Sequence, residues 1–325
     1  MSGVARAFGC SVNVQHAPFD PDQVERALDR AYSDVRDLTD GQVAQVYPAL
    51  AEVDPGLFGL CAVDVTGQVW ERGDTEAGFG LMSTAKPFTF ALVCAAIGAD
   101  RARDEIGVNA TGSEYNDVEP VLAAPGGRTN PMVNAGAIAT CSRVPGVGAD
   151  AQWARLLDGL SAFAGRQLYL DEALYENVMA TNVRNRELAD ALASKGALVT
   201  SAAEALELYS KQSCLSTTAH DLAVMGATLA NGGVNPVTGV RVVPAHVVRP
   251  VLAVMLTSGL YELSGEWLYD VALPAKTGLG GGIVTVAPGR MGLGGFSPLL
   301  DEAANTVRGA QGLAVAADEL GLGLF

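Results

Sequence analysis

The chain has 325 residues, of which 49% are hydrophobic and 18% charged, and its formal net charge at pH 7 is −15. This apolar content suffices for a substantial core and excludes an intrinsically disordered chain. The negative charge argues against a partner that is nucleic acid or an anionic membrane surface, and no apolar run reaches the roughly 20 residues that span a bilayer.

The first predicted elements are an arm, a helix and a hairpin. Residues 1–19 show no clear period and are expected to form a loose N-terminal arm. Asp20 is suited to cap a helix that has Pro21 at its first position. Apolar residues then recur at helical spacing on one face: Val24, Ala27, Leu28, Ala31, Val35 and Leu38. Segments 57–65 and 68–71, separated by a turn at 64–67, predict a hairpin.

The next stretch carries the first candidate for chemistry. Ser83 follows a glycine-bearing loop, Lys86 lies three residues later, and residues 88–96 are apolar on all sides, which predicts a buried helix. Pro87 is tolerated in a first helical turn. Positions i and i+3 share a helix face, so the Lys86 amine should reach the Ser83 hydroxyl. A serine beside a lysine kept neutral by burial is a nucleophile with its base.

The remainder of the chain is mainly helical and then returns to strands. Helices are expected at 151–164, 186–194, 202–211 and 219–231, a hairpin joins 283–287 to 291–296, and a last helix begins near residue 305. This order predicts an α+β fold in which an antiparallel sheet comes from both chain ends and encloses an inserted helical lobe. We expect one catalytic domain over 20–325, with a sheet lobe at about 20–82 and 266–325 and a helical lobe at about 83–265.

Cysteines and histidines give no sign of a metal or cofactor. The five cysteines are Cys10, Cys61, Cys94, Cys141 and Cys214. Their odd number and wide spacing favour reduced thiols over disulfides or a zinc site. The histidines, at positions 16, 220 and 246, lack metal-ligand spacing, and His246 is expected to pack in an apolar run. No basic segment precedes an apolar core at the N-terminus, so no signal peptide is predicted and a cytoplasmic location is expected.

A second motif supports the first. Lys276-Thr277-Gly278 precedes a glycine-rich loop and a strand. Ser-x-x-Lys followed much later by Lys-Thr-Gly is the pairing of serine β-lactamases and penicillin-binding proteins. The middle Ser-Asp-Asn motif of those enzymes is absent, which argues against membership of that group. The pair predicts a serine enzyme that transfers acyl groups.

Longer stretches resemble one family, the serine-dependent glutaminases, whose fold is similar to that of β-lactamases. The resemblance runs in the family's order from about residue 20 to the end. Its matching pieces are residues 83–86, 130–138, Thr181, 184–186, 222–236, 258–261, 264–265, 273–278, 296–298 and 300–301.

The resemblance implies roles for individual residues. Ser83 would be the nucleophile, Lys86 its base and Tyr261 a proton relay near the leaving group. Family contacts to the substrate fall on Asn134, Asn185 and Tyr209, and the oxyanion would be held by the backbone N–H groups of Ser83 and Leu279. Without the resemblance, the same asparagines and tyrosines would be interpreted as ordinary buried or rim residues.

The chain departs from the family pattern where the substrate's head group would bind. The family has a glutamate seven residues before Asn185 that pairs with the substrate's α-ammonium, and Val178 stands there, with Glu176 two residues away. A tyrosine expected at position 46 is replaced by Val46, because the aromatic residue has moved to Tyr47. Met82 stands where Gln or Glu is common, and Gln212-Ser213-Cys214 reverses the family's Gln-Cys-Ser.

These observations predict an amidohydrolase that acts on a small carboxamide through an acyl-enzyme on Ser83, with L-glutamine as the expected substrate. Two alternatives stay open: a divergent amidase or acyltransferase that acts on a γ-glutamyl or other modified amide, and a binding protein with weakened catalysis. The resemblance also implies a homodimer or homotetramer.

Overall fold

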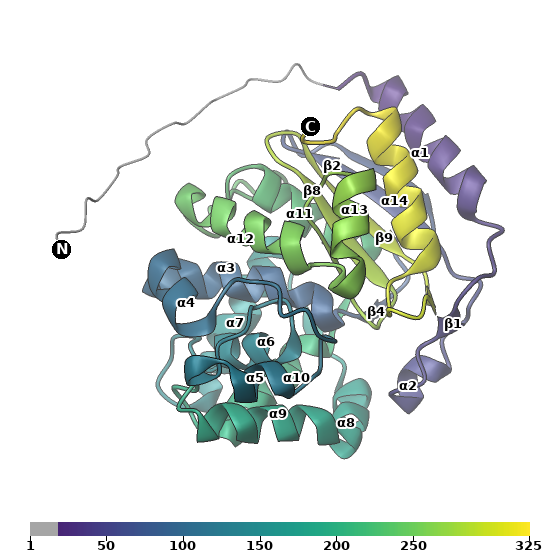
Figure 1. Ribbon diagram of the computed structural model, residues 1–325. Coiled ribbons are helices and arrows are strands. Elements are labelled where there is room, and N and C mark those ends of the chain that lie inside the picture. The colour runs from purple at the N-terminus through teal and green to yellow at the C-terminus, as the bar shows by residue number, and fades with distance from the viewer. Residues whose placement is uncertain (1–18) are drawn as a thin grey trace.

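The computed structural model describes residues 19–325, which are drawn with their element labels in Figure 1. All but the last residue of the N-terminal arm expected at 1–19 therefore lies outside the described part of the chain. The predicted N-cap is confirmed: Asp20 accepts a hydrogen bond from the Asp22 N–H at the start of α1 (Pro21–Val35). The helix ends three residues before Leu38, which was the last predicted position on its apolar face.

A five-stranded antiparallel sheet joins the two ends of the chain. Its strands are β2 (Gly59–Asp64), β3 (Val69–Gly73), β7 (Ala275–Thr277), β8 (Gly282–Ala287) and β9 (Met291–Phe296). Their order is β3-β2-β9-β8-β7, so the N-terminal hairpin pairs with the C-terminal strands through β2 and β9. Both predicted hairpins and the predicted origin of the sheet are confirmed.

Helices from the chain ends cover one face of this sheet. In Figure 1 the purple α1 and the yellow α14 (Val307–Glu319) lie side by side over it, and α13 (Ser264–Asp270) lies beside α14. Leu28 of α1 and Leu313 of α14 share a buried cluster with Leu60 and Leu293 of the sheet. Burial of these apolar side chains fixes the outer layer to the sheet.

The other face is covered by α11 (Ala219–Ala230), although this helix falls within the range expected to form the helical lobe. Glycines in β9 allow the contact. A Cβ at Gly292 would lie 2.0 Å from the backbone nitrogen of Ala227, and one at Gly294 would lie 2.1 Å from the carbonyl oxygen of Ala219. Any side chain at either position would push the helix off the sheet.

The helical part begins at the turn that bears Ser83 and packs around a separate core. Its helices are α3 (Lys86–Ile97), α4 (Ala99–Ile106), α5 (Glu119–Ala123), α6 (Asn134–Cys141), α7 (Ala149–Ala164), α8 (Glu172–Thr181), α9 (Val183–Ser194), α10 (Ala202–Ser213) and α12 (Ala245–Ser258). The helix predicted at 88–96 is confirmed as the buried α3, whose Phe88 packs against Phe163 of α7 with ring centroids 5.1 Å apart.

Shorter elements complete the chain. They are β1 (Gln42–Val43), α2 (Pro48–Ala51), β4 (Phe79–Gly80), the 3₁₀ turns η1 (Met82–Ala85), η2 (Pro125–Gly127) and η3 (Tyr261–Leu263), β5 (Tyr169–Leu170), β6 (Leu215–Thr217) and β10 (Leu299–Leu300). β4, β6 and β5 form a small sheet immediately before η1, and β1 pairs with β10. The small sheet therefore anchors the approach to Ser83.

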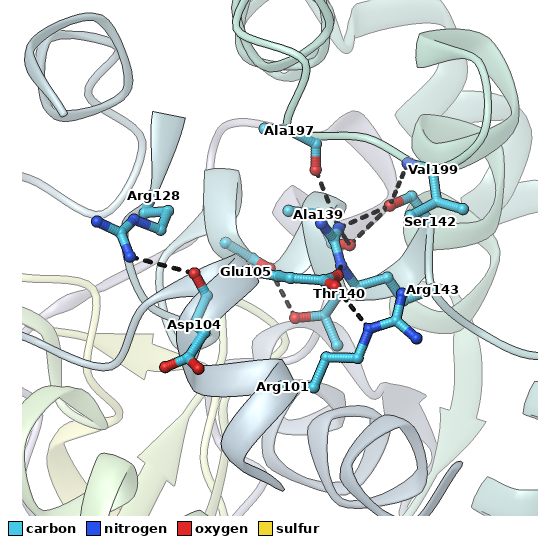
Figure 2. A network of polar contacts seen from close by, with 11 residues as sticks. Arg101, Asp104, Glu105, Arg128, Ala139, Thr140, Ser142, Arg143, Ala197 and Val199 are labelled. Carbon is cyan, nitrogen blue, oxygen red and sulfur yellow. Dashed lines mark hydrogen bonds and ion pairs between the residues drawn. The ribbon is translucent and has the colours of Figure 1, made fainter. Parts of the chain in front are cut away.

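A buried arginine holds the far end of α6, as Figure 2 shows. The side chain of Arg143 donates to Glu105 Oε2 at 2.8 Å, to the Ala139 carbonyl at 2.7 Å and to the Ala197 carbonyl at 2.9 Å. These bonds join α4, α6 and the segment after α9. Because α6 begins at Asn134, the network also fixes the helix that carries a predicted site residue.

Two sequence expectations concern single side chains and membrane spans. His246 is exposed on α12, so the expectation that it packs in the core was wrong: its neighbours Val247 and Val248 take the buried positions of that turn. Within residues 19–325 no single helix is long and apolar enough to cross a membrane. Two helix pairs reach that length and composition only together, across bends of 116° and 101°.

Candidate active site

Ser83 lies in η1, a single 3₁₀ turn between β4 and α3, and not in α3 itself. In a 3₁₀ turn residues i and i+3 are eclipsed, which places Lys86, the first residue of α3, on the side of Ser83. The residue before the serine is strained: Met82 has a φ of +45°, a value that L-residues with a side chain rarely adopt. Such strain at a turn that presents a serine is typical of functional sites.

The Lys86 amine is fully buried and makes two hydrogen bonds. It donates to Asn134 Oδ1 at 2.7 Å and to the Met132 carbonyl at 3.2 Å. Burial disfavours the charged ammonium and lowers the pKa of Lys86 to about 7. Between residues 19 and 325 no hydrogen bond of normal geometry joins Ser83 to Lys86, so the two residues share one turn without a direct bond.

Asn134 begins a chain of side-chain amides. Its Nδ2 donates to Asn185 Oδ1 at 2.9 Å, and Asn185 Nδ2 donates to Asn182 Oδ1 at 2.6 Å. Asn182 Nδ2 then donates to Ser210 Oγ at 3.1 Å. The lysine amine requires an oxygen facing it, and this requirement sets the orientation of each amide that follows. Four buried side chains from α6, the α8–α9 junction, α9 and α10 are thereby held in one arrangement.

A cavity of about 30 Å³ opens beside Ser83. It brings together five of the sequence-predicted residues: Ser83, Asn134, Asn185, Tyr209 and Leu279. The residues that complete its lining are Tyr47, Met82, Tyr115, Val178, Ser210 and Ser213.

The expectation that the cavity lacks a tyrosine near position 46 was wrong. Tyr47 is buried and lines the cavity, whereas Val46 is 54% exposed. Pro48 begins α2 directly after Tyr47, whose extended backbone turns the ring inward. Burial raises the pKa of Tyr47 to about 12, so the phenol stays protonated at neutral pH.

Val178 faces the cavity and is buried, as the sequence departure predicts. Glu176 cannot take the place of the missing glutamate, because it is exposed on α8 and lies about 200° around the helix from Val178. In the part of the chain that the structure describes, no Asp or Glu lines this cavity. Ser213 of the reversed motif reaches the cavity, while Cys214 is fully buried behind it.

The glycine-rich loop after Lys276 packs directly on the Ser83 turn. A Cβ at Gly278 would lie 3.1 Å from the backbone nitrogen of Ser83, and one at Gly280 would lie 2.3 Å from the carbonyl oxygen of Gly80. Leu279 therefore sits against η1, and among the described residues no acceptor takes its backbone N–H. The backbone N–H groups of Ser83 and Leu279 thus belong to two segments that pack against each other.

Tyr261 lines a neighbouring cavity of about 310 Å³. It has a φ of +54° and a buried hydroxyl that forms no hydrogen bond of normal geometry within the described chain. Burial raises the pKa of Tyr261, and the nearby Ser83 side chain opposes this effect. The Lys276 amine lies 4.1 Å from the centroid of its ring and donates to the Gly259 carbonyl at 2.9 Å.

Sequence reasoning missed Asn182, Tyr115 and Ser210. Asn182 sits between two helices in a stretch that gives no signal of chemistry, and its role is visible only from the amide chain. The ring of Tyr115 is tilted by 35° against that of Tyr261, with ring centroids 4.5 Å apart, and the Tyr115 carbonyl accepts a hydrogen bond from the Asn134 N–H. Ser210 follows Tyr209 in α10, so the tyrosine could have pointed to it.

The fold and the site define a hydrolase with a β-lactamase-like fold: an antiparallel sheet, a helical part, and a serine–lysine turn at the seam. The family model for glutaminase matches residues 41–325. The chain belongs to the glutaminase family, hydrolases that convert glutamine to glutamate and ammonia.

Similar proteins agree over nearly the whole length. Glutaminase 2 of Yersinia pestis is 49% identical over 314 residues, which are 97% of this chain and 92% of that protein. The glutaminase of Brucella canis is 43% identical over 94% of this chain and 96% of its own. The solved structure of the probable glutaminase ybaS is 40% identical, with a TM-score of 0.93 over 94% of this chain and 99% of that one.

A further solved structure carries a small molecule. It is the probable glutaminase from Bacillus subtilis complexed with 6-diazo-5-oxo-L-norleucine, which is 29% identical to this chain with a TM-score of 0.82. The match covers 95% of this chain and 99% of that one.

Proposed function

We propose that this protein hydrolyses L-glutamine through an acyl-enzyme on Ser83, with Lys86 as the base. The observation that carries the proposal is the bonding of the Lys86 amine. A neutral amine has two N–H groups and one lone pair, and two acceptors, Asn134 Oδ1 and the Met132 carbonyl, use both N–H groups. The lone pair is left for the Ser83 hydroxyl, and a pKa of about 7 keeps a large fraction of the amine neutral at physiological pH.

In the proposed first step, the Ser83 oxygen attacks the side-chain carboxamide carbon of the substrate. The hydroxyl proton passes to Lys86 as the new C–O bond forms. The backbone N–H groups of Ser83 and Leu279 then stabilise the oxyanion, because both are fixed in position before the reaction begins. This role is supported by the close packing of Gly278 on the Ser83 backbone.

In the proposed second step, the tetrahedral intermediate collapses and the C–N bond breaks. Tyr261, a neutral phenol beside Ser83, relays a proton to the departing nitrogen, so that ammonia leaves. Water attacks the acyl-enzyme in the same way and releases glutamate.

The substrate's side-chain amide would be read by Asn134, Asn185 and Tyr209, which line the cavity with Ser83. The bound molecule in the Bacillus subtilis structure is an amino acid with a diazoketone in place of the side-chain amide, which supports a substrate shaped like glutamine. Val178 leaves the α-ammonium without a carboxylate partner in the cavity. A γ-glutamyl amide or an amide without a free α-ammonium is therefore the second candidate substrate.

Replacing the nucleophile tests the proposal. The Ser83→Ala variant should lose at least about 10³-fold in kcat for glutamine, since no other group supplies the attacking oxygen. Ser194→Ala, which changes an exposed serine at the end of α9, is the matched control and should keep full activity. Circular dichroism should show both variants folded. Undiminished turnover in Ser83→Ala would exclude the acyl-enzyme.

Three broader properties belong to the same proposal. We infer a homodimer or homotetramer, which light scattering on the purified protein tests. The four buried cysteines of the described chain are unpaired thiols, which supports a cytoplasmic location. The division into a sheet lobe at about 20–82 and 266–325 and a helical lobe at about 83–265 is supported by the origin of the five-stranded sheet, whose strands all come from the two end segments.

A further inference from the structure

Away from the Ser83 cavity, three metal-ligating side chains meet at the edge of the five-stranded sheet. Cys61 of β2 and Glu71 of β3 are directly opposite each other in the antiparallel register. Opposed residues project from the same face, with Cβ atoms about 4.5–5.5 Å apart. Cys61 shares a buried cluster with Ala223 and Val224, so this face is the one that α11 covers.

The third side chain belongs to α11, which covers this face of the sheet. His220 is the second residue of that helix, and its Nδ1 lies 2.9 Å from Glu71 Oε1. The ligand atoms of Cys61, Glu71 and His220 all lie within 4.8 Å of one another. Glu76, in the connection between β3 and β4, brings a fourth candidate ligand, with Oε1 3.7 Å from the same histidine nitrogen.

A histidine–glutamate hydrogen bond accounts for only part of this arrangement. It explains the contact between His220 and Glu71 but gives no reason for a thiol beneath them. The Cys61 thiol is fully buried, and its one hydrogen bond within the described chain is a weak contact of 4.0 Å to the Ala62 carbonyl.

The electrostatic surroundings of Cys61 favour a cation. The carboxylates of Glu71, Glu76 and Asp221 lie near its buried thiol. Asp221 is already paired with Arg166, whereas Glu71 and Glu76 face the histidine. A bound divalent ion would neutralise these charges and stabilise the thiolate, as metals do for coordinating thiols.

We propose that Cys61, Glu71 and His220 bind a zinc ion, with Glu76 or water as the fourth ligand. Thiolate sulfur, imidazole nitrogen and carboxylate oxygen are the donors that zinc takes in tetrahedral sites. Ligands at about 2.0–2.3 Å from such an ion are about 3.5 Å apart. The contact between His220 and Glu71, at 2.9 Å, would therefore lengthen slightly, and separations of up to 4.8 Å within the group would shorten. Binding transfers the Cys61 proton to solvent and forms the Zn–S bond.

The site is open on one side and closed on the other. The side chains of His220 and Glu71 are 32% and 38% exposed, which gives an ion a path from solvent. Cys61 is fully buried on the inner side of the site. The ion would tie β2, β3, the β3–β4 connection and α11 together. None of these residues lines the Ser83 cavity, so the zinc would stabilise the fold and leave the chemistry at Ser83 unchanged.

Cobalt binding to the metal-depleted full-length protein tests the proposal. One equivalent of Co²⁺ should produce the near-ultraviolet thiolate-to-cobalt band and the visible bands of a tetrahedral site, and Zn²⁺ should displace it. Cys61→Ala should abolish the thiolate band. His220→Gln should weaken binding by at least about 100-fold, since even loss of an outer-shell partner costs about 10- to 100-fold.

Two matched controls separate this site from adventitious binding. Cys94→Ala removes an equally buried cysteine of α3, and His246→Gln removes an exposed histidine of α12; both should bind cobalt as the wild type does. Zinc should raise the melting temperature of the wild type and not of His220→Gln.

Absence of the thiolate band at saturating cobalt, or its persistence in Cys61→Ala, would overturn the proposal. Should Cys61→Ala fail to fold, Glu71→Gln and His220→Gln give the same decision, because both change half-exposed side chains.

Discussion

The amine of Lys86 lies 2.7 Å from Asn134 Oδ1. This bond ties the proposed base of the reaction to the first of three amides that end at Ser210. The base and the residues proposed to read the substrate are therefore one hydrogen-bonded unit. A substitution at one end of this unit should therefore change the position of the side chains at the other end.

The pH dependence of turnover should report on Lys86. Its base form exists above a pKa of about 7, so log kcat/KM should rise with unit slope below that pH and level off above it. Steady-state rates with glutamine from pH 5 to 9 measure this profile. A flat profile across about pH 7 would contradict the assignment of Lys86 as the base.

Lys86 should also leave a signature in stability. Its folded-state pKa of about 7 lies below the ordinary value of 10.5, so between these values the unfolded chain binds more protons at this residue. The free energy of unfolding should therefore rise with pH across this window. The rise should be smaller in Lys86→Met and unchanged in Lys195→Met, an exposed control. Urea denaturation at several pH values provides the comparison.

Asn182 should act as a positioning residue. Asn182→Ala leaves Asn185 Nδ2 and Ser210 Oγ without partners, which should cost about 1–3 kcal/mol of stability. Because Asn185 is a proposed substrate contact, KM for glutamine should rise more than kcat falls. Asn182→Asp, which keeps the oxygen that faces Asn185, should recover part of the KM. A stable variant in which kcat falls by as large a factor as KM rises would argue for a different role.

Val178 should set the preference for the substrate's head group. Val178→Glu places a carboxylate in the cavity, and a charged hydrogen bond to the α-ammonium is worth about 1.5–3 kcal/mol. The ratio of kcat/KM for glutamine over Nα-acetylglutamine should therefore increase by about 10- to 100-fold. An unchanged ratio would show that the ammonium binds elsewhere.

Local patterns in the sequence predicted the elements whose signals are themselves local. The segments 283–287 and 291–296 predicted the β8–β9 hairpin, and its limits differ from the observed ones only by one residue at the start of β8. Ser83 and Lys86 could be paired because their spacing holds in either type of helix. Asn134, Asn185 and Tyr209 could be brought together only through the family resemblance, since they come from three separate helices.

Features that depend on tertiary packing could not be predicted in this way. The extended backbone of Tyr47 before Pro48 turns its ring into the cavity, and Met82 has a φ of +45°, and neither feature leaves a pattern in the sequence. The close seat of α11 on Gly292 requires knowledge of which helix covers the sheet. Cys61, Glu71 and His220 are spread over 160 positions by number, so no spacing rule could join them.

Covalent trapping with 6-diazo-5-oxo-L-norleucine tests the central claim most directly. If Ser83 is the nucleophile, its oxygen should displace N₂ from the reagent. The enzyme should then gain the mass of the reagent less N₂, and peptide mapping should place the adduct on Ser83 and find none in Ser83→Ala. An adduct on another residue, such as the thiol of Cys214, or inactivation with no adduct at Ser83, would contradict the account.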